Sequence, residues 1–149
     1  MNGWKSPKPS VEELLHGCAG VLIAGCGGGG DLVQSVSIMN YAKNLGVNNV
    51  CLATISVNWW GAFSDGCEVF DLDWFQPAER IGPDLARILP DTRLTGGMGA
   101  GKPTYEIAMA RTFDVPVYAI HLGNGLPGVR GALEEIIRRH GCAVSYTHL

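Results

Sequence analysis

The stretch Gly20-Val21-Leu22-Ile23-Ala24-Gly25-Cys26-Gly27-Gly28-Gly29-Gly30-Asp31 decides the fold class of this chain. Its first five residues are apolar and bounded by glycines, a pattern typical of a strand buried on both faces of a parallel sheet. From Asp31 the apolar residues recur at helical spacing, and Gly46 stands where a left-handed helix cap is expected. The stretch therefore predicts a strand, a glycine loop over residues 25–30 and a helix of about four turns.

Regular elements are also expected on either side of this stretch. Ser10 and Glu13 have the spacing of a capping box before a short helix, and residues 50–57 have strand composition, which completes a βαβ unit. Further on, the sequence predicts a helix with Pro103 at its first position, a strand over residues 115–122 and an amphipathic helix that ends at Gly141. Strands that alternate with helices predict a Rossmann-like, doubly wound α/β fold with a mostly parallel sheet.

The middle of the chain has weaker patterns. A short strand is expected near residues 69–72, and a helix is expected after Pro83 that ends before Pro90. In a strand, Asp71 and Asp73 would share one face, where they could hold a metal ion or simply face solvent.

Composition excludes several classes of protein. The chain has 149 residues, of which 46% are hydrophobic and 17% charged, with a net charge of -3. Disorder and a coiled coil are therefore excluded, and no basic surface for nucleic acid or an anionic membrane is expected. No apolar run approaches the length of a membrane span, and the five cysteines form no C-x-x-C pair. A single cytoplasmic domain that binds a small molecule is the expectation.

Two glycine loops are the candidate binding elements. Residues 25–30 match G-x-G-x-x-G between a predicted strand and a predicted helix, and Gly123-Asn124-Gly125-Leu126-Pro127-Gly128 repeats the pattern after the later strand. Backbone N–H groups in such a loop can approach a phosphate, and both loops would lie at the carboxyl edge of a parallel sheet. The alternative is that both are ordinary strand-to-helix turns. The residues predicted to contact a ligand are Gly25, Gly27, Gly28, Gly29, Gly30, Asp31, Gly123 and Gly125.

Asp31 limits the kind of ligand, because its carboxylate would repel a phosphate bound to the same helix start. It could cap the helix, hold Mg²⁺ beside a phosphate, or accept a hydrogen bond from a ribose hydroxyl or an amine. A nucleotide with Mg²⁺ is the cofactor that these residues suggest. Ordinary NAD binding is disfavoured, because residues 46–64 contain no Asp or Glu to contact the ribose.

Two further features lie near the predicted loops. Residues 96–102 spell G-x-x-x-x-G-K, but Pro103 occupies the position of the Mg²⁺-binding Ser or Thr of a P-loop. Lys102 could instead reach a phosphate from a flexible loop. His121 lies at the carboxyl end of a predicted strand beside the second glycine loop, where ligand groups gather, although a structural histidine is the alternative.

The run from Val21 to Asp31 resembles the opening of a largely archaeal family catalogued as domain of unknown function 1152. A second stretch, from Gly96 to Leu133, is similar to that family in order and spacing. The resemblance covers about residues 20–143 and implies a Rossmann-like fold with an aspartate-bearing glycine loop at Gly27, Gly28, Gly29, Gly30 and Asp31. It implies no known reaction, and the chain departs from the family around residues 58–60.

The last six residues, 144–149, resemble the translation of a sequencing adapter. We therefore expect an N-terminal arm and short helix over residues 1–19, and a Rossmann-like α/β domain, incomplete at its C-terminus, over residues 20–143. Tyr146 and His148 are excluded from every site hypothesis for this reason.

The functional hypothesis is a cytoplasmic α/β protein, more consistent with an enzyme than with a scaffold, that binds a phosphorylated or nucleoside-like metabolite. The sequence indicates neither a reaction nor a catalytic residue. One alternative is a non-catalytic ligand-sensing or protein-interaction domain, and another is an adenosyl-methionine-type methyltransferase. Neither nucleic acid nor a membrane is an expected partner, and association between copies of the chain stays open.

Overall fold

The structure, a computed structural model, describes residues 10–26, 29–59, 67–142 and 144–148. It is a mixed α/β structure, as the sequence predicts. Its elements in chain order are α1 (Val11–Leu15), β1 (Gly20–Gly25), α2 (Gly29–Asn44), β2 (Asn49–Ile55), β3 (Val57–Trp59), β4 (Cys67–Val69), the 3₁₀ helix η2 (Leu72–Trp74), β5 (Phe75–Gly82), β6 (Leu85–Leu94), α3 (Tyr105–Thr112), β7 (Val117–Ile120), α4 (Gly125–His140) and β8 (Val144–His148).

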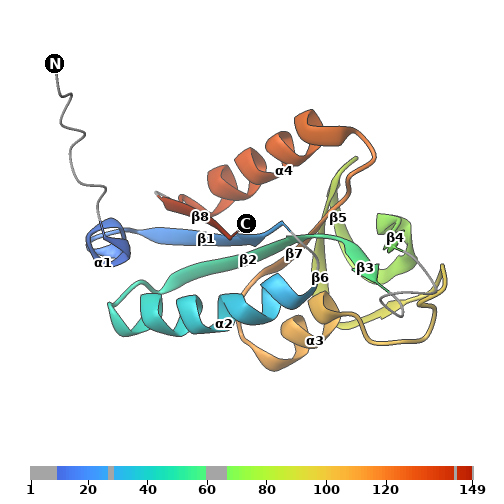
Figure 1. Cartoon of the computed structure of the whole chain (residues 1–149), viewed down its shortest axis with the longest axis horizontal. Coiled ribbons are helices and arrows are strands. Elements are labelled where there is room, and N and C mark those ends of the chain that lie inside the picture. Colours follow the sequence, from blue (N-terminus) through green and yellow to red (C-terminus); the bar gives the residue numbers. More distant parts are fainter. Residues whose placement is uncertain (1–9, 27–28, 60–66, 143, 149) are drawn as a thin grey trace, which may run out of the picture.

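One sheet organises the molecule (Figure 1). Its strand order is β5-β6-β7-β2-β1-β8, and β3 and β4 pair separately as a two-stranded sheet. The strands β7, β2, β1 and β8 are mutually parallel, whereas β6 is antiparallel to both β5 and β7. Parallel pairing at the centre of the sheet requires crossover connections, and α2 supplies the one between β1 and β2.

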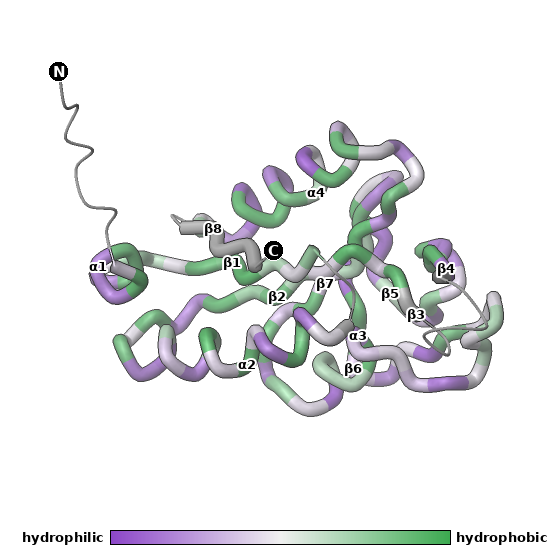
Figure 2. Tube along the Cα trace, viewed as in Figure 1, coloured by the Kyte–Doolittle hydropathy of each residue, from purple (hydrophilic) through white to green (hydrophobic). Residues whose placement is uncertain are grey.

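Helices cover both faces of the sheet, with α2 and α3 on one face and α4 on the other (Figure 1). Successive residues of β1 point to opposite faces, so Ile23 packs in the core beneath α2 and α3 while Leu22 packs in the core beneath α4. This is why the strand is apolar at every position, which Figure 2 shows as a continuous hydrophobic segment.

The predicted helix ends are confirmed where local chemistry determines them. At α1, Ser10 Oγ accepts a hydrogen bond from the Glu13 backbone N–H, and the Glu13 carboxylate accepts one from the Ser10 N–H. The glycines that follow α2 and α4 are left-handed, with φ of 86° at Gly46 and 59° at Gly141. Both conformations favour glycine, since it carries no Cβ.

Three predictions in the middle of the chain are wrong. The first is the helix expected between Pro83 and Pro90. Pro83 and Asp84 instead form the short connection between β5 and β6. Pairing with β5 on one side and β7 on the other makes residues 85–94 a strand. Long-range backbone pairing of this kind overrides local helix propensity.

The second correction concerns Asp71 and Asp73, which do not share a strand face. The Asp71 carboxylate caps η2 by accepting a hydrogen bond from the Asp73 backbone N–H. The third concerns Pro103, because α3 begins at Tyr105 with Thr104 as its N-cap. The Thr104 hydroxyl accepts a hydrogen bond from the free backbone N–H of Ile107, and this N-cap determines where α3 begins.

The backbone of residues 144–148 forms β8, which pairs in parallel with β1 from Val21 to Gly25. The assignment of these residues to an adapter stays a prediction.

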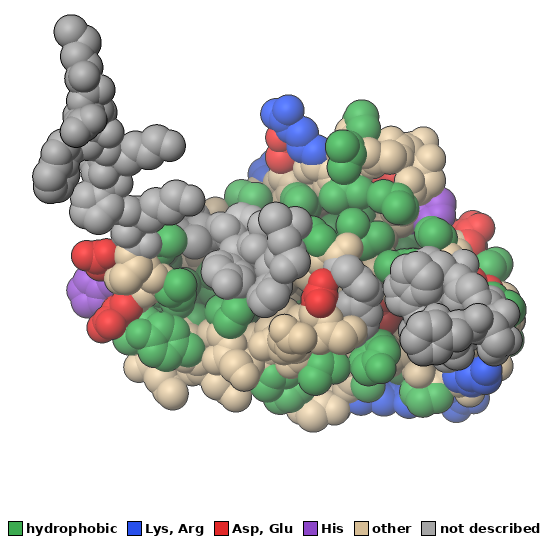
Figure 3. Space-filling model, viewed as in Figure 1, with side chains coloured by type: hydrophobic (Ala, Val, Ile, Leu, Met, Phe, Trp, Pro, Cys, Tyr) green, Lys and Arg blue, Asp and Glu red, His purple; other side chains and the backbone are tan. Residues whose placement is uncertain are grey.

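Figure 3 shows hydrophobic side chains on the part of the surface formed by α4, and Leu126 near the start of this helix is 81% exposed. Among the described residues, no helix is long and apolar enough to cross a membrane.

Candidate functional site

The carboxyl ends of β1, β2 and β7 meet at one edge of the sheet, because these strands are parallel. Both α2 and α4 begin at this edge, each directly after a strand. Helix starts carry free N–H groups and the positive end of the helix dipole. The edge therefore combines two helix starts with two glycine-containing turns.

The first glycine loop brings the start of α2 directly onto the end of β1. A Cβ atom placed on Gly25 would lie 2.8 Å from the Asp31 Cβ and 3.3 Å from the Leu32 backbone nitrogen, so only glycine allows this approach. Gly29 and Gly30 are the first two residues of α2, and a Cβ on Gly30 would meet nothing within 4 Å. Gly27 and Gly28 lie outside the described residues.

Asp31 is the third residue of α2 and is partly exposed. Its backbone carbonyl accepts a hydrogen bond of 2.9 Å from Ser35 Oγ, within the first turns of the helix. Among the described residues, no group of three or more His, Cys, Asp or Glu side chains could hold a metal ion. The role of Asp31 in metal binding stays a prediction.

Ser56 lies just past the end of β2, between the two glycine turns, and was missed by the sequence analysis. It is fully buried, and its Oγ has no hydrogen-bond partner of good geometry within the described part of the chain. Its backbone N–H donates to the Ile120 carbonyl of β7, and its carbonyl accepts from the Phe70 N–H. Buried hydroxyl groups are usually paired, so this one is an unusual feature of the edge.

Glu106, at the start of α3, is a second buried polar residue near Ser56, and it was also missed. It is only 2% exposed. Burial raises the pKa of its carboxyl group. Its own backbone and the nearby Thr104 and Ser56 hydroxyls lower this pKa, but the effect of burial is larger. No local sequence signal identifies such a residue, because its burial follows from the packing of α3 on the sheet.

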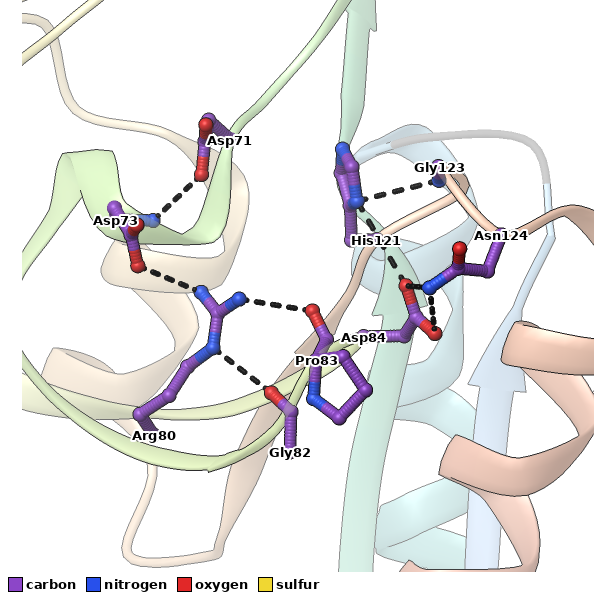
Figure 4. Close-up of polar contacts among 9 residues, drawn as sticks. All are labelled: Asp71, Asp73, Arg80, Gly82, Pro83, Asp84, His121, Gly123 and Asn124. Carbon is purple, nitrogen blue, oxygen red and sulfur yellow. Dashed lines mark hydrogen bonds and ion pairs between the residues drawn. The ribbon is translucent and has the colours of Figure 1, made fainter.

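The second glycine loop surrounds a network formed by His121, Asn124 and Asp84 (Figure 4). Asn124 Nδ2 donates hydrogen bonds of 3.0 and 2.9 Å to Asp84 Oδ1 and Oδ2. His121 Nδ1 accepts from the Gly123 N–H at 3.2 Å and lies 3.8 Å from Asp84 Oδ1. Gly125, with φ of 62°, is the first residue of α4. This loop thus binds a carboxylate of the protein itself.

Asp84 is the residue of this network that sequence reasoning missed, because it lay in the helix wrongly predicted after Pro83. The signal was present in Gly82-Pro83-Asp84, since Gly, Pro and Asp together are typical of a turn. Arg80 holds this turn by donating hydrogen bonds to the carbonyls of Gly82 and Pro83, both at 2.8 Å (Figure 4).

The stretch 96–102 is not a P-loop, because it follows the antiparallel strand β6 and α3 starts only at Tyr105. Gly97 packs against Glu68 and Trp74, and Glu68 Oε1 accepts a hydrogen bond from the Met98 N–H. These contacts and its φ of 71° explain the glycine at position 97. Contact between Lys102 and a phosphate stays a prediction.

Cys18, Cys26, Cys51 and Cys142 are free thiols. Cys51 and Cys142 are buried in the core beneath α4. Burial raises the pKa of Cys51 to about 12, which keeps its thiol protonated at neutral pH. These two residues therefore behave as small apolar side chains.

Comparisons with known proteins assign the chain to a family and give no further relative. Searches of curated proteins and of solved structures gave no match. A family described as "Protein of unknown function (DUF1152)" matches residues 22–146, which include most of β1, both glycine loops and α4. The chain therefore belongs to the DUF1152 family of proteins of unknown function.

Proposed function

We propose that this chain has a Rossmann-like fold that binds a phosphorylated or nucleoside-like metabolite at the carboxyl end of β1. The supporting observation is the order of the parallel strands, β7-β2-β1. Numbered along the chain, these three parallel strands lie in the order third, second and first, as in the first half of a dinucleotide-binding sheet.

In such a sheet the topological switch point lies beside β1, on the side away from β2. The chain leaves β1 through α2 on one face of the sheet and leaves β7 through α4 on the other face (Figure 1). Connections that diverge in this way leave a crevice at the carboxyl ends of the strands, where ligands of open α/β sheets bind. The first glycine loop lies at this point.

The chemistry of the loop favours an anionic group with a cation beside it. The start of α2 offers N–H donors and a positive dipole end to a phosphate, and Gly25 allows close approach of the helix to β1. Asp31 on the same turn would then bind Mg²⁺ that is also coordinated by phosphate oxygens, because protein-bound Mg²⁺ commonly uses one or two carboxylates together with substrate phosphates.

A nicotinamide or adenosyl-methionine cofactor is less consistent with the end of β2. Such cofactors have their ribose held by an acidic residue there, whereas this strand ends at Ile55 and continues through Ser56. Neither residue is acidic, so the end of this strand offers no carboxylate to a ribose. We therefore favour a phosphorylated metabolite or a nucleoside phosphate in a cytoplasmic protein.

Calorimetric titration with AMP, ADP and inorganic pyrophosphate, each with and without Mg²⁺, tests this function. We expect at least one probe to bind saturably, with Mg²⁺ strengthening the binding. Asp31→Asn should weaken the Mg²⁺-dependent binding about tenfold or more, whereas the control Asp91→Asn, an exposed carboxylate in β6, should bind like the parent chain. Failure of all three probes to bind to folded protein would overturn the proposal.

A further inference from the structure

A separate cavity of about 330 Å³ lies between the β5–β6 turn and the first turns of α4. It lies at the start of α4, whereas the binding site proposed above lies at the start of α2. Pockets for small molecules begin at about this volume. Its lining residues are Ile81, Gly82, Pro83, Asp84, Leu85, Pro127, Gly128, Gly131, Ala132 and Glu135.

Glycines on α4 keep this cavity open. A Cβ on Gly128 would lie 2.6 Å from Asp84 Oδ2, so a larger residue would collide with the carboxylate. A Cβ on Gly131 would meet nothing within 4 Å, so the space in front of this residue is empty. The opposite wall is the turn that Arg80 holds through the Gly82 and Pro83 carbonyls (Figure 4). The cavity thus lies between the first turns of α4 and a turn whose backbone is held by hydrogen bonds from Arg80.

Asp84 gives this cavity a buried negative group. The residue is 6% exposed and lines the cavity, with Oδ2 beside Gly128. Asn124 donates one hydrogen bond to each carboxylate oxygen, and each oxygen can accept about two. Oδ2 therefore retains the capacity to accept a further hydrogen bond.

The remaining lining fits a partly apolar ligand of positive charge. Apart from Asp84, the only ionisable lining residue is Glu135, and its carboxylate is held by Arg138 and Arg139. None of the lining residues is Lys, Arg or His. A buried carboxylate is stabilised most by a charge-assisted hydrogen bond from a cation, and apolar walls exclude competing water.

We propose that this cavity binds a small organic amine, whose ammonium group donates to Asp84 Oδ2 and whose apolar part contacts Ile81, Leu85 and Ala132. This site is independent of phosphate binding at the start of α2. A purely structural role for Asp84, joining the β5–β6 turn to α4 through Asn124, is the competing explanation. It predicts no preference for a cation, and the charge of the ligand therefore distinguishes the two.

Three probes with the same phenyl ring and different charge test the proposal: benzylammonium, benzyl alcohol and benzoate, each titrated into the full chain and followed by ligand-observed NMR. We expect saturable binding of benzylammonium, with a Kd about tenfold or more below that of benzyl alcohol, and no binding of benzoate. Equal binding of benzylammonium and benzyl alcohol would overturn the proposal, as would no binding of benzylammonium.

Two variants and one control locate the binding. Gly131→Leu fills empty space on an exposed helical position, so it should fold and reduce benzylammonium binding about tenfold or more. Ser37→Leu makes the same addition at an exposed position of α2, on the other face of the sheet, and should leave binding unchanged. Asp84→Asn should remove the preference for benzylammonium over benzyl alcohol. Parent-like binding by Gly131→Leu would contradict the site, even if Asp84→Asn does not fold.

Discussion

At the scale of single residues, Glu106 makes the stability of the protein depend on pH. Burial raises the pKa of its carboxyl group from the ordinary value of 4.5. The folded chain therefore retains this proton at pH values where the unfolded chain has released it. The contribution of Glu106 to stability is complete below about pH 4.5 and is lost as the pH rises through the folded-state pKa.

Glu106→Gln should remove this part of the pH dependence, because an amide does not ionise. We expect the parent chain to lose more free energy of unfolding than the variant between about pH 5 and about pH 8, by on the order of 1 kcal/mol. Urea denaturation of both proteins at the two pH values measures the difference. Equal losses would mean that Glu106 ionises as readily in the folded chain as in the unfolded one.

Gly128 and Gly131 are a matched pair on one helix. Glycine to alanine in a helix ordinarily stabilises by about 0.5–1 kcal/mol, and Gly131→Ala should do so because its Cβ meets open space. Gly128→Ala should instead destabilise by about 1–3 kcal/mol, since its Cβ would lie 2.6 Å from Asp84 Oδ2. Thermal denaturation of both variants checks the opposite signs, and stabilisation by both would show that Asp84 moves aside freely.

At the scale of elements, the hairpin of β5 and β6 positions Asp84. Arg80 donates to the carbonyls of Gly82 and Pro83 and also forms an ion pair of 2.9 Å with Asp73. A lysine cannot make this set of contacts, because its ammonium group is a single point and not a planar fork. The hairpin turn therefore depends on arginine at this position.

Arg80→Lys should lower the free energy of unfolding by about 0.5–1.5 kcal/mol, a modest effect because the side chain is partly exposed. Hydrogen exchange of the β5 and β6 amides should increase as well. Arg93→Lys, in β6 opposite Gln76, is the control and should change neither quantity by more than about 0.5 kcal/mol. Equal effects of the two substitutions would remove the special role of Arg80.

At the scale of the whole molecule, one sheet joins two cores. Ile107 belongs to the core beneath α2 and α3, and Ile136 to the core beneath α4. Both are at most 1% exposed, so replacing either by alanine should cost about 2–5 kcal/mol. Because the two cores share β1, β2 and β7, we expect each variant to unfold in a single transition.

Urea unfolding followed by circular dichroism and by tryptophan fluorescence tests this cooperativity. Trp74, one of the four tryptophans of the chain, packs against the core beneath α2 and α3, so the fluorescence includes a reporter on that face while circular dichroism reports on the whole chain. Coincident curves are expected for both variants. Separate curves for Ile136→Ala would show that α4 unfolds independently of the opposite face.

Local sequence was sufficient for the elements whose limits depend on neighbouring residues. The capping box at Ser10 and the left-handed glycines at 46 and 141 are short-range features, and each was predicted. The predicted helix after Pro83 is wrong because residues 85–94 pair as β6 with the preceding strand β5 and with β7, which follows later in the chain. For the same reason Asp84 was missed as a partner of the second glycine loop.

The sequence by itself determined the alternation of strands and helices, since periodic burial and glycine conformations are properties of short segments. It also identified both glycine loops and the family. Only the tertiary structure decided which polar groups meet at the carboxyl edge, because strand order and sheet pairing bring together residues as distant as Asp84 and Asn124. The burial of Ser56 and Glu106 arises in the same way, since desolvation depends on every element packed around a group and not on its neighbours in sequence.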